Sequence, residues 1–457
     1  MRAVVFLLLS FVCAFKLKVG RFRSSVTGGT AVVFALCLLP TIGVVGLGID
    51  YMQALSYKRR LDAAADSSAL AAISAAQTYY NANNGSMTDS AVTSGAIAAG
   101  NAQGLRAFKV NSSGAYSLLT ATPAVTVTRS LQTFTSSVNY TAQMATSFGK
   151  LFGTPKFNLG LTTGSTLTMG SYIDFYLMLD VSGSMGLPTS NDGQTALAAI
   201  NPDQKDQYPS GCVFACHYSG YKGYGLAKSN NIKLRVDSVA SAVTNLISTA
   251  NSTKTLTNQF RIGVYPFIVD AMQAAPLSTD FTQATQVANN LAANYLDTGT
   301  NSTMGAGGTH FENVFPDVVQ YFKGSGAGTS AQAPKAFVFL VTDGMDNAQT
   351  YTNSNFSGSS PGEPNNFGYC QYAQGQGVTI AILYIPYVPI QNPNHSFAND
   401  EDGKVNNIIS NVSQPIPTDL KNCATPGYFF TANSDADINN AMQTMFAQAL
   451  QAARLIK

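Results

Sequence analysis

Three oxygen-bearing side chains stand at alternate positions directly after a short apolar run, FYLML at 175–179. They are Asp180, Ser182 and Ser184. A serine hydrolase needs one serine activated by a base, whereas a carboxylate and two hydroxyls in one tight loop are donors that a hard cation such as Mg²⁺ prefers. The spacing therefore predicts part of a cation cage, whose remaining ligands must come from other segments.

Two further oxygen donors stand where they could complete this cage. Asp343 follows a second apolar run at 335–341, and Thr309 lies at the entrance to a helix-forming segment. Because the carboxyl ends of parallel strands meet at one edge of a sheet, we expect these residues to lie close together. Each has another interpretation when taken alone. Thr309 and Glu312 fit a capping box, Asp343 begins an Asp-Gly turn pair, and Asp180 could satisfy its own loop.

The elements that must position these residues alternate between strand and helix. Continuous apolar runs are typical of strands buried on both faces, as in a parallel sheet covered by helices. Such runs lie at 175–180, 260–269, 335–343 and 378–387, and helical patterns lie at 233–250, 282–295 and 435–455. The alternation predicts a doubly wound α/β head with a mainly parallel, Rossmann-like sheet over 171–457, interrupted by an insertion at 185–232.

The order Asp-x-Ser-x-Ser, then Thr, then Asp-Gly resembles the metal-ion-dependent adhesion site (MIDAS) of von Willebrand factor A domains, over residues 172–455. The resemblance implies hydroxyl ligands, direct or through water, and two nearby carboxylates; these are Ser182, Ser184 and Thr309, and Asp180 and Asp343. The implied cofactor is Mg²⁺, with Mn²⁺ or Ca²⁺ as the other candidates. The implied mode of binding is that an acidic side chain of a partner protein completes the shell of the ion.

A membrane anchor is expected near the N-terminus. Residues 30–49 carry no charge over 20 positions, a length that spans a hydrocarbon core of about 30 Å, and Pro40 is tolerated inside such a helix. The Ala- and Leu-rich sequence that follows continues the helical pattern, which predicts one helix over 28–80. Lys and Arg residues in the preceding segment 1–27 favour a cytoplasmic N-terminus, and the apolar run at 4–15 is a signal-peptide core or an upstream extension.

The stretch GGTAVVFALCLLP…GIDYMQALSYKRRLDAAADSSALAA resembles the N-terminal helix of TadE/TadG-like proteins of the tight-adherence (Flp) pilus assembly system. Pilin-like members of that group carry a glutamate shortly after a processing glycine. This chain has none there, which implies a retained anchor, as in TadG-type members. The resemblance implies a single-pass protein of the inner (cytoplasmic) membrane with its C-terminal domain in the periplasm, and partners among other pilus-assembly or envelope proteins.

Residues 81–170 are expected to link anchor and head. Their polar, Gly- and Asn-rich first part, to 118, predicts loops around one or two short helices. Alternating sequence such as VTVT at 125–128 predicts a small β-rich subdomain after them. The tyrosine-rich insertion at 185–232 flanks the candidate metal loop, so it either covers the site, contacts a partner or is a surface excursion.

Four cysteines in the soluble-looking part suit two disulfides in an oxidising compartment. We expect Cys212 to pair with Cys216 inside the insertion, and a bridge between Cys370 and Cys423 to tie the edge of the sheet. The sequence CVFACH also resembles a haem-attachment motif with one extra residue, or half a zinc site, although no second ligand cluster accompanies it.

Composition restricts the function further. Charged residues make up 11% of the chain and the net charge is +2, so no broad basic surface for nucleic acid is expected. No His lies near Ser182 or Ser184 in the sequence, so we expect no hydrolase and no enzyme activity. The predicted function is metal-dependent, adhesion-type protein binding in Flp/Tad-type pilus assembly or surface adhesion. The alternatives are a minor pilin or pilus-tip structural adhesin built into the fibre, and a von Willebrand A subunit of a metal chelatase, which the membrane anchor disfavours.

Overall fold

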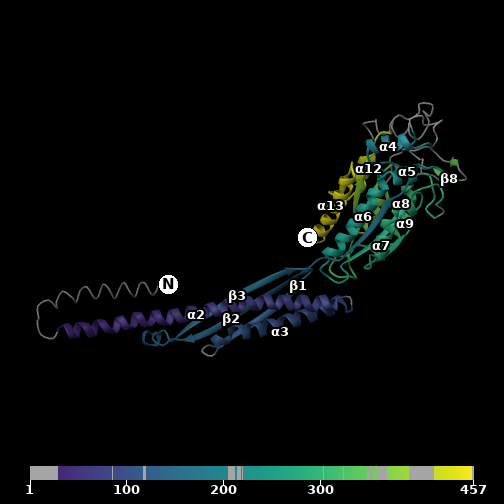
Figure 1. Cartoon of the computed structure of the whole chain (residues 1–457). Helices are drawn as coiled ribbons and strands as arrows, with labels where there is room; N and C mark the ends of the chain where they lie inside the picture. Colours follow the sequence, from purple (N-terminus) through teal and green to yellow (C-terminus); the bar gives the residue numbers. More distant parts are fainter. Residues whose placement is uncertain are drawn as a thin grey trace. The chain divides into compact units, whose positions relative to one another are not determined.

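The structure is a computed structural model of the whole chain (Figure 1). It describes residues 29–84, 86–116, 120–203, 211–213, 218, 220–301, 303–322, 324–346, 349–352, 355–357, 368–390 and 416–454. The chain divides into two compact units. The first comprises residues 1–79, 94–128 and 134–167, and the second comprises residues 80–93, 129–133 and 168–457.

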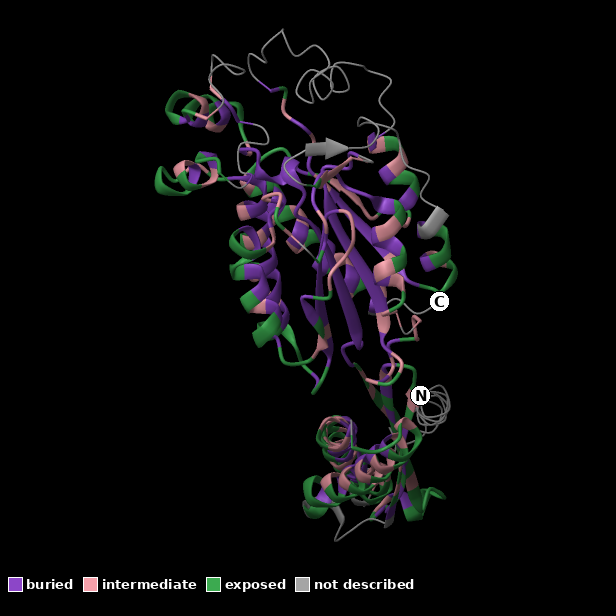
Figure 2. Ribbon diagram, turned by 90° about the vertical axis from the view of Figure 1, so that its right-hand side faces the viewer, coloured by how far each residue is buried: buried purple, intermediate pink, exposed green. Residues whose placement is uncertain are grey.

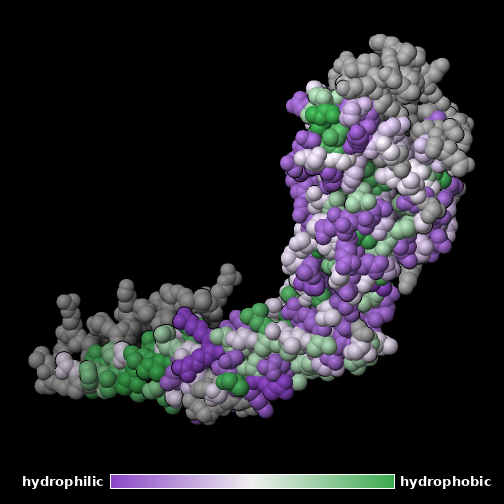
Figure 3. Space-filling model, turned by 45° about the vertical axis from the view of Figure 1, so that its right-hand side comes forward, coloured by the Kyte–Doolittle hydropathy of each residue, from purple (hydrophilic) through white to green (hydrophobic). Residues whose placement is uncertain are grey.

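One long helix, α2 (Gly29–Asn83), supplies the N-terminal part of the first unit. It is continuous over 55 residues, which confirms the expected single helix, and it contains Pro40. Among the described residues it is the one helix whose length and composition would let it cross a membrane, with a mean hydropathy of 2.5 over its most apolar window. Hydrophobic side chains gather on its N-terminal part in Figure 3.

A second helix, α3 (Asp89–Tyr116), packs against α2 where loops with one or two short helices were predicted. The glycines that favoured loops instead allow close packing of the two helices. A Cβ atom on Gly100 would lie 2.8 Å from the Ala72 carbonyl oxygen, and one on Gly104 would lie 3.0 Å from the Ala72 Cβ. The Ser68 hydroxyl also donates a hydrogen bond to the Gly104 carbonyl, at 2.8 Å.

The predicted β-rich subdomain is a three-stranded sheet in the order β1-β2-β3. Its strands are β1 (Thr120–Ser130), β2 (Thr133–Ala145) and β3 (Lys156–Thr168). Buried and exposed residues alternate along β2, as expected for a sheet with one covered face. On that face Tyr140 packs against Phe108 of α3, and the Ser136 hydroxyl donates to the Ala69 carbonyl of α2 at 2.9 Å.

The second unit is built on a six-stranded sheet in the order β11-β10-β7-β4-β5-β6. Its strands are β4 (Ile173–Asp180), β5 (Phe260–Phe267), β6 (Ala275–Ser278), β7 (Lys335–Thr342), β10 (Thr379–Tyr384) and β11 (Phe429–Thr431). The pairs β4–β5, β4–β7, β7–β10 and β10–β11 are parallel, and the short edge strand β6 is antiparallel to β5. The predicted doubly wound, mainly parallel α/β fold is therefore confirmed.

Helices lie on both sides of this sheet, and the four central strands between them are buried along most of their length (Figure 2). The two faces of β4 show why its sequence is continuously apolar. Phe175 packs against Phe446 of α13 (Asp435–Arg454), with ring centroids 5.3 Å apart. The next residue, Tyr176, points to the other face and packs against Phe322, which follows α9 (Phe311–Val319), at 4.7 Å.

The helical patterns at 233–250 and 282–295 form helices, with bounds that differ from the predicted ones. The pattern at 233–250 forms α6 (Arg235–Thr253), which packs against α13. The pattern at 282–295 is divided into α7 (Thr282–Asn289) and α8 (Leu291–Tyr295). Short helices also form within the predicted insertion and beside the sheet edge; they are α4 (Asn191–Ile200), α5 (Gly223–Ser229), α10 (Gly368–Gly375) and α12 (Ile416–Cys423). The two-stranded sheet β8 (Thr350–Thr352) and β9 (Asn355–Ser357) completes the described elements.

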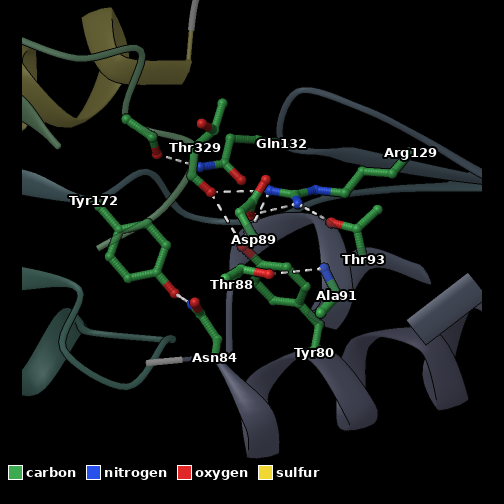
Figure 4. Close-up of polar contacts among 11 residues, drawn as sticks. Tyr80, Asn84, Thr88, Asp89, Ala91, Thr93, Arg129, Gln132, Tyr172 and Thr329 are labelled. Carbon is green, nitrogen blue, oxygen red and sulfur yellow. Dashed lines mark hydrogen bonds and ion pairs between the residues drawn. The ribbon is translucent and has the colours of Figure 1, made fainter. Parts of the chain in front are cut away.

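A polar cluster holds residues 80–93 and the β1–β2 turn within the second unit (Figure 4). The Arg129 guanidinium donates to the Asp89 carboxylate and to the Thr329 carbonyl, both at 2.9 Å, and lies over the Tyr80 ring. Asn84 and Tyr172 are also joined by a hydrogen bond. These contacts connect the end of α2 and the start of α3 to the segments that flank β4 and β7.

Candidate metal site at the carboxyl edge of the sheet

The candidate site lies where the strand order of the sheet reverses. Numbered along the chain, the six strands run 3-2-1-4-5-6 across the sheet, so the first strand, β4, lies beside the fourth, β7. In open α/β sheets the crevice for a ligand forms outside the carboxyl ends of the strands at this switch point. Asp180 is the last residue of β4, and Asp343 directly follows β7.

Asp180 and the two serines form one buried, hydrogen-bonded loop. The Asp180 carboxylate accepts the Ser182 backbone N–H at 2.9 Å and the Thr342 hydroxyl, from the end of β7, at 2.6 Å. A short 3₁₀ turn over Gly183–Gly186 then brings the Ser182 and Ser184 hydroxyl oxygens within 3.1 Å of each other. The predicted grouping of these three oxygen donors at the strand end is therefore present in the structure.

Asp343 has a partner that the sequence analysis missed. Arg235, in the first turn of α6, is fully buried and places its Nη1 3.3 Å from the Asp343 Oδ2. Its Nη2 donates to the Pro386 carbonyl at 3.0 Å, and its guanidinium lies 4.8 Å from the centre of the Tyr387 ring. The hydroxyls of Ser184 and Tyr387 also lower the pKa of Asp343, which connects this carboxylate to the serine loop.

Thr309 lies at the same edge of the sheet, where a backbone hydrogen bond of the next residue holds its loop. The His310 N–H donates to the carbonyl of Ile268, the residue after β5, at 3.1 Å. The Val181 N–H donates to the carbonyl of Phe267, the last residue of β5, at 3.1 Å, so the two loops lie at adjacent strand ends. Thr309 is buried there. It does not cap the following helix, because α9 begins at Phe311 with His310 as the capping position.

A third buried carboxylate, Asp297, organises the loop that carries Thr309, and the sequence analysis missed it. Its backbone N–H donates to the Val181 carbonyl at 2.8 Å, directly after β4. Its carboxylate accepts N–H groups of Gly299 and Gly307, at 2.8 and 2.9 Å, and the Tyr218 hydroxyl of the insertion at 3.2 Å. Gly307 has φ +125°, and a Cβ there would lie 2.6 Å from the Gln349 carbonyl oxygen, so this turn requires glycine.

The electrostatics of the site favour a bound cation. Burial, and then the nearby charge of Asp343, raise the pKa of Asp180 to about 7. Burial also raises the pKa of Asp343, although the Arg235 guanidinium and the hydrogen bonds from Ser184 and Tyr387 oppose this effect. Asp343 has an arginine beside it, whereas Asp180 is held by N–H and hydroxyl donors, and a divalent cation would stabilise both carboxylates in their charged forms.

The donor set fits a hard cation held mainly by hydroxyls. Over the part of the chain that the structure describes, no group of three or more His, Cys, Asp and Glu side chains could hold a metal ion, so a soft or carboxylate-rich site is not formed there. Two carboxylates and the neighbouring hydroxyls are the oxygen donors suited to Mg²⁺ or Mn²⁺. The coordination by Asp180, Ser182, Ser184, Thr309 and Asp343 stays a prediction.

One of the two predicted disulfides is present among the described residues, and the other involves a residue outside them. Cys370 of α10 and Cys423 of α12 form a disulfide with their Cα atoms 5.3 Å apart, as expected. Cys216 lies outside the described residues, so its pairing with Cys212 stays a prediction.

Comparison with known proteins places α2 in a pilus-assembly family. Residues 28–78 match the family model described as "Putative Flp pilus-assembly TadE/G-like". No curated protein sequence matches the chain.

Three of the solved structures to which the chain is similar have von Willebrand-type, pilus or MIDAS titles. The vWF domain of the type V pili tip protein Mfa5 from Porphyromonas gingivalis is 12% identical, with a TM-score of 0.36, covering 64% of this chain and 99% of that one. The pilus adhesin SpaC from Lactobacillus rhamnosus GG is 13% identical (TM-score 0.34; 73% and 35% covered). Proximal thread matrix protein 1 from the mussel byssus, with a zinc-occupied MIDAS motif, is 14% identical (TM-score 0.33; 62% and 49% covered). The chain thus spans between a third and a half of the last two.

Proposed function

We propose that this chain, whose N-terminal helix is TadE/G-like, is a membrane-anchored module that binds a protein partner through a metal ion, in Flp/Tad-type pilus assembly or surface adhesion. One observation carries the proposal: a segment that matches a pilus-assembly family model and a buried oxygen-donor cluster at the switch point of a doubly wound sheet occur in the same chain. The first feature supports the cellular context, and the second supports the mode of binding.

The residues of the site would hold the ion with incomplete charge neutralisation. Ser182, Ser184 and Thr309 are neutral donors, and Arg235 already offsets part of the charge of Asp343. When bound, the cation would supply a Lewis-acidic position for one more oxygen ligand. An acidic side chain of a partner is the natural ligand for that position, because it brings the negative charge that the site lacks.

The proposed location follows from α2 and the charges before it. The uncharged run 30–49 would cross the inner membrane, and the basic residues in 1–27 favour the cytoplasm for the N-terminus. The second unit would then lie in the periplasm, where the Cys370–Cys423 disulfide is stable. We propose that the chain has no enzymatic activity. We also propose that it has no nucleic-acid partner, because its net charge is low and few of its residues are charged.

The proposal is tested in the source cell by replacing the chromosomal copy with Asp180→Ala. We expect loss of surface pili or of surface adhesion, with the variant present at the wild-type level in the membrane fraction by immunoblot. The exposed Asp192 of α4 provides the control, Asp192→Ala, which should behave as wild type. Unchanged piliation and adhesion in Asp180→Ala would contradict the proposal. Immunogold label along the fibres, instead of at the membrane, would favour the minor-pilin alternative.

A further inference from the structure

The loop between β2 and β3 is folded against the apolar part of α2. This β2–β3 loop, residues 146–155, contains the 3₁₀ turn Gly149–Phe152, and it lies in the first unit together with α2. It contacts a single stripe of the helix, formed by Gly43, Gly46 and Asp50. These positions are three and four residues apart, so they share one face, and all three are buried.

Asp50 fixes the loop through its backbone. The carboxylate accepts the N–H groups of Ser147, Phe148 and Gly149 at 2.9, 2.8 and 2.8 Å. Hydrogen bonds to an ionised carboxylate are roughly twice as strong as those between neutral groups, so these three bonds fix the backbone of the loop on the helix. The loop is also closed on itself, because the Thr146 hydroxyl donates to the Thr154 carbonyl at 2.6 Å.

The two glycines of the stripe make room for aromatic rings of the loop. A Cβ atom on Gly46 would lie 2.3 Å from Cγ of Phe148, close to the backbone of the loop, and one on Gly43 would lie 2.2 Å from Cζ of Phe152. Gly48, on another face of α2, has nothing within 4 Å of its Cβ position. Glycine at 43 and 46 is therefore explained by contact within this chain.

The tip of the β2–β3 loop exposes apolar side chains beside the uncharged run 30–49 of α2. Leu151 is 77% exposed and Phe152 is 51% exposed, and the charged Lys150 beside them is exposed as well. Gly43 lies six residues before the end of the uncharged run at Ile49, which is about 9 Å along a helix axis. This distance is comparable to the roughly 5–10 Å by which interfacial amphipathic helices bury their apolar faces at the boundary of headgroups and acyl chains.

We propose that the β2–β3 loop enters the lipid leaflet beside α2, with Leu151 and Phe152 among the acyl chains and Lys150 at the phosphate level. The proposal rests on the membrane anchoring of α2 proposed above. The occupant is lipid and not a protein groove, because the exposed tip is continuous with the exposed apolar surface of α2, and because a lysine beside apolar side chains can keep its ammonium group at the headgroups while its stem lies along apolar surface. The first unit would then have two membrane attachments, which resist its rotation about α2.

The absence of Trp from the sequence allows each position to be probed with a single tryptophan. Leu151→Trp in the full chain, reconstituted into vesicles with brominated acyl chains, should show blue-shifted emission that the bromines quench and aqueous iodide does not. The matched control is Leu105→Trp, an exposed leucine on α3, which iodide should quench and bromine should not. If Leu151→Trp behaves like Leu105→Trp, the loop does not enter lipid and the proposal is overturned.

A third tryptophan separates this proposal from the anchor itself. Leu39→Trp, on the exposed surface of the apolar run, should be quenched by bromine if α2 crosses the bilayer. Quenching at position 39 without quenching at 151 overturns the loop proposal alone, whereas loss of quenching at both positions overturns the anchoring.

The glycine stripe is tested in the Leu151→Trp background. Gly46→Ala should displace Phe148 and lower the bromine quenching at position 151, whereas Gly48→Ala should leave it unchanged. Both substitutions leave a helix-forming residue in α2. Equal quenching in the two variants would show that the loop is not seated on Gly46, contrary to the proposal.

Discussion

At the scale of single residues, the buried ion pair of Arg235 and Asp343 sets the charge balance of the candidate site. Their side chains are both excluded from solvent, and the guanidinium is the cation nearest to the carboxylate among the described residues. Removing one member of a buried pair leaves an uncompensated buried charge, which typically costs about 3–5 kcal/mol. A divalent ion in the site would offset part of this loss.

We therefore predict that Arg235→Met destabilises the protein by about 3–5 kcal/mol in EDTA and by less in millimolar Mn²⁺, measured by urea unfolding of the second unit within the full chain. The control is Lys228→Met, which removes the partly exposed ion pair with Asp237 and should cost at most about 1 kcal/mol in either condition. A loss in Arg235→Met that is equal with and without Mn²⁺ would argue against an ion beside Asp343.

The residues of the site differ in how far the sequence could predict them. Asp180 and Asp343 were predictable, because each directly follows a continuous apolar run and the ends of parallel strands share an edge. Arg235 was not, because an arginine at the start of an amphipathic helix is normally solvated, and its burial depends on a partner 108 residues away. Asp297 was missed for the same reason, since its role comes from backbone contacts between loops.

At the scale of elements, the Cys370–Cys423 disulfide joins α10 to α12 beside the edge strands β10 and β11. It closes a segment with a sequence separation of 53 residues. In the chain-entropy description, a loop of this length stabilises the folded protein by about 4 kcal/mol, because the crosslink restricts the unfolded chain.

We predict that the double variant Cys370→Ser/Cys423→Ser lowers the free energy of unfolding by about 2–4 kcal/mol under non-reducing conditions. Cys37→Ser, which removes the cysteine of α2 that forms no disulfide, is the control and should leave this free energy unchanged. Peptide mapping without reductant should recover the Cys370–Cys423 crosslink from the wild type. Identical urea midpoints for the double variant and the control would contradict a structural role for this bridge.

The elements were predictable where one pattern dominated the sequence. The continuous apolar runs predicted the four central strands to within a few residues, because strands buried on both faces consist almost entirely of apolar residues. The sequence predicted only one or two short helices where the continuous α3 forms, because Gly100 and Gly104 normally interrupt helices. In the folded chain these two glycines allow α3 to approach α2 closely, an advantage that only the tertiary structure reveals.

At the scale of the whole molecule, the chain combines a TadE/G-like helix in its first unit with the switch-point site in its second. The family segment covers residues 28–78 only, so the pilus context rests on α2 and the binding mechanism rests on the head. The proposed binding function therefore depends on whether five residues from three separate loops, brought to one edge of the sheet, hold a single hard cation.

A titration of the full-length protein in detergent with Mn²⁺, followed by the electron paramagnetic resonance signal of the free ion, tests this claim most directly. We predict that the wild type takes up one Mn²⁺ per chain, that Mg²⁺ competes for it, and that Asp192→Ala does the same. Asp180→Ala should take up none while keeping the wild-type circular dichroism spectrum, because Asp180 is buried at the end of its strand but is not part of the apolar core cluster. Equal uptake by Asp180→Ala and the wild type, or no uptake by either, would contradict the metal site.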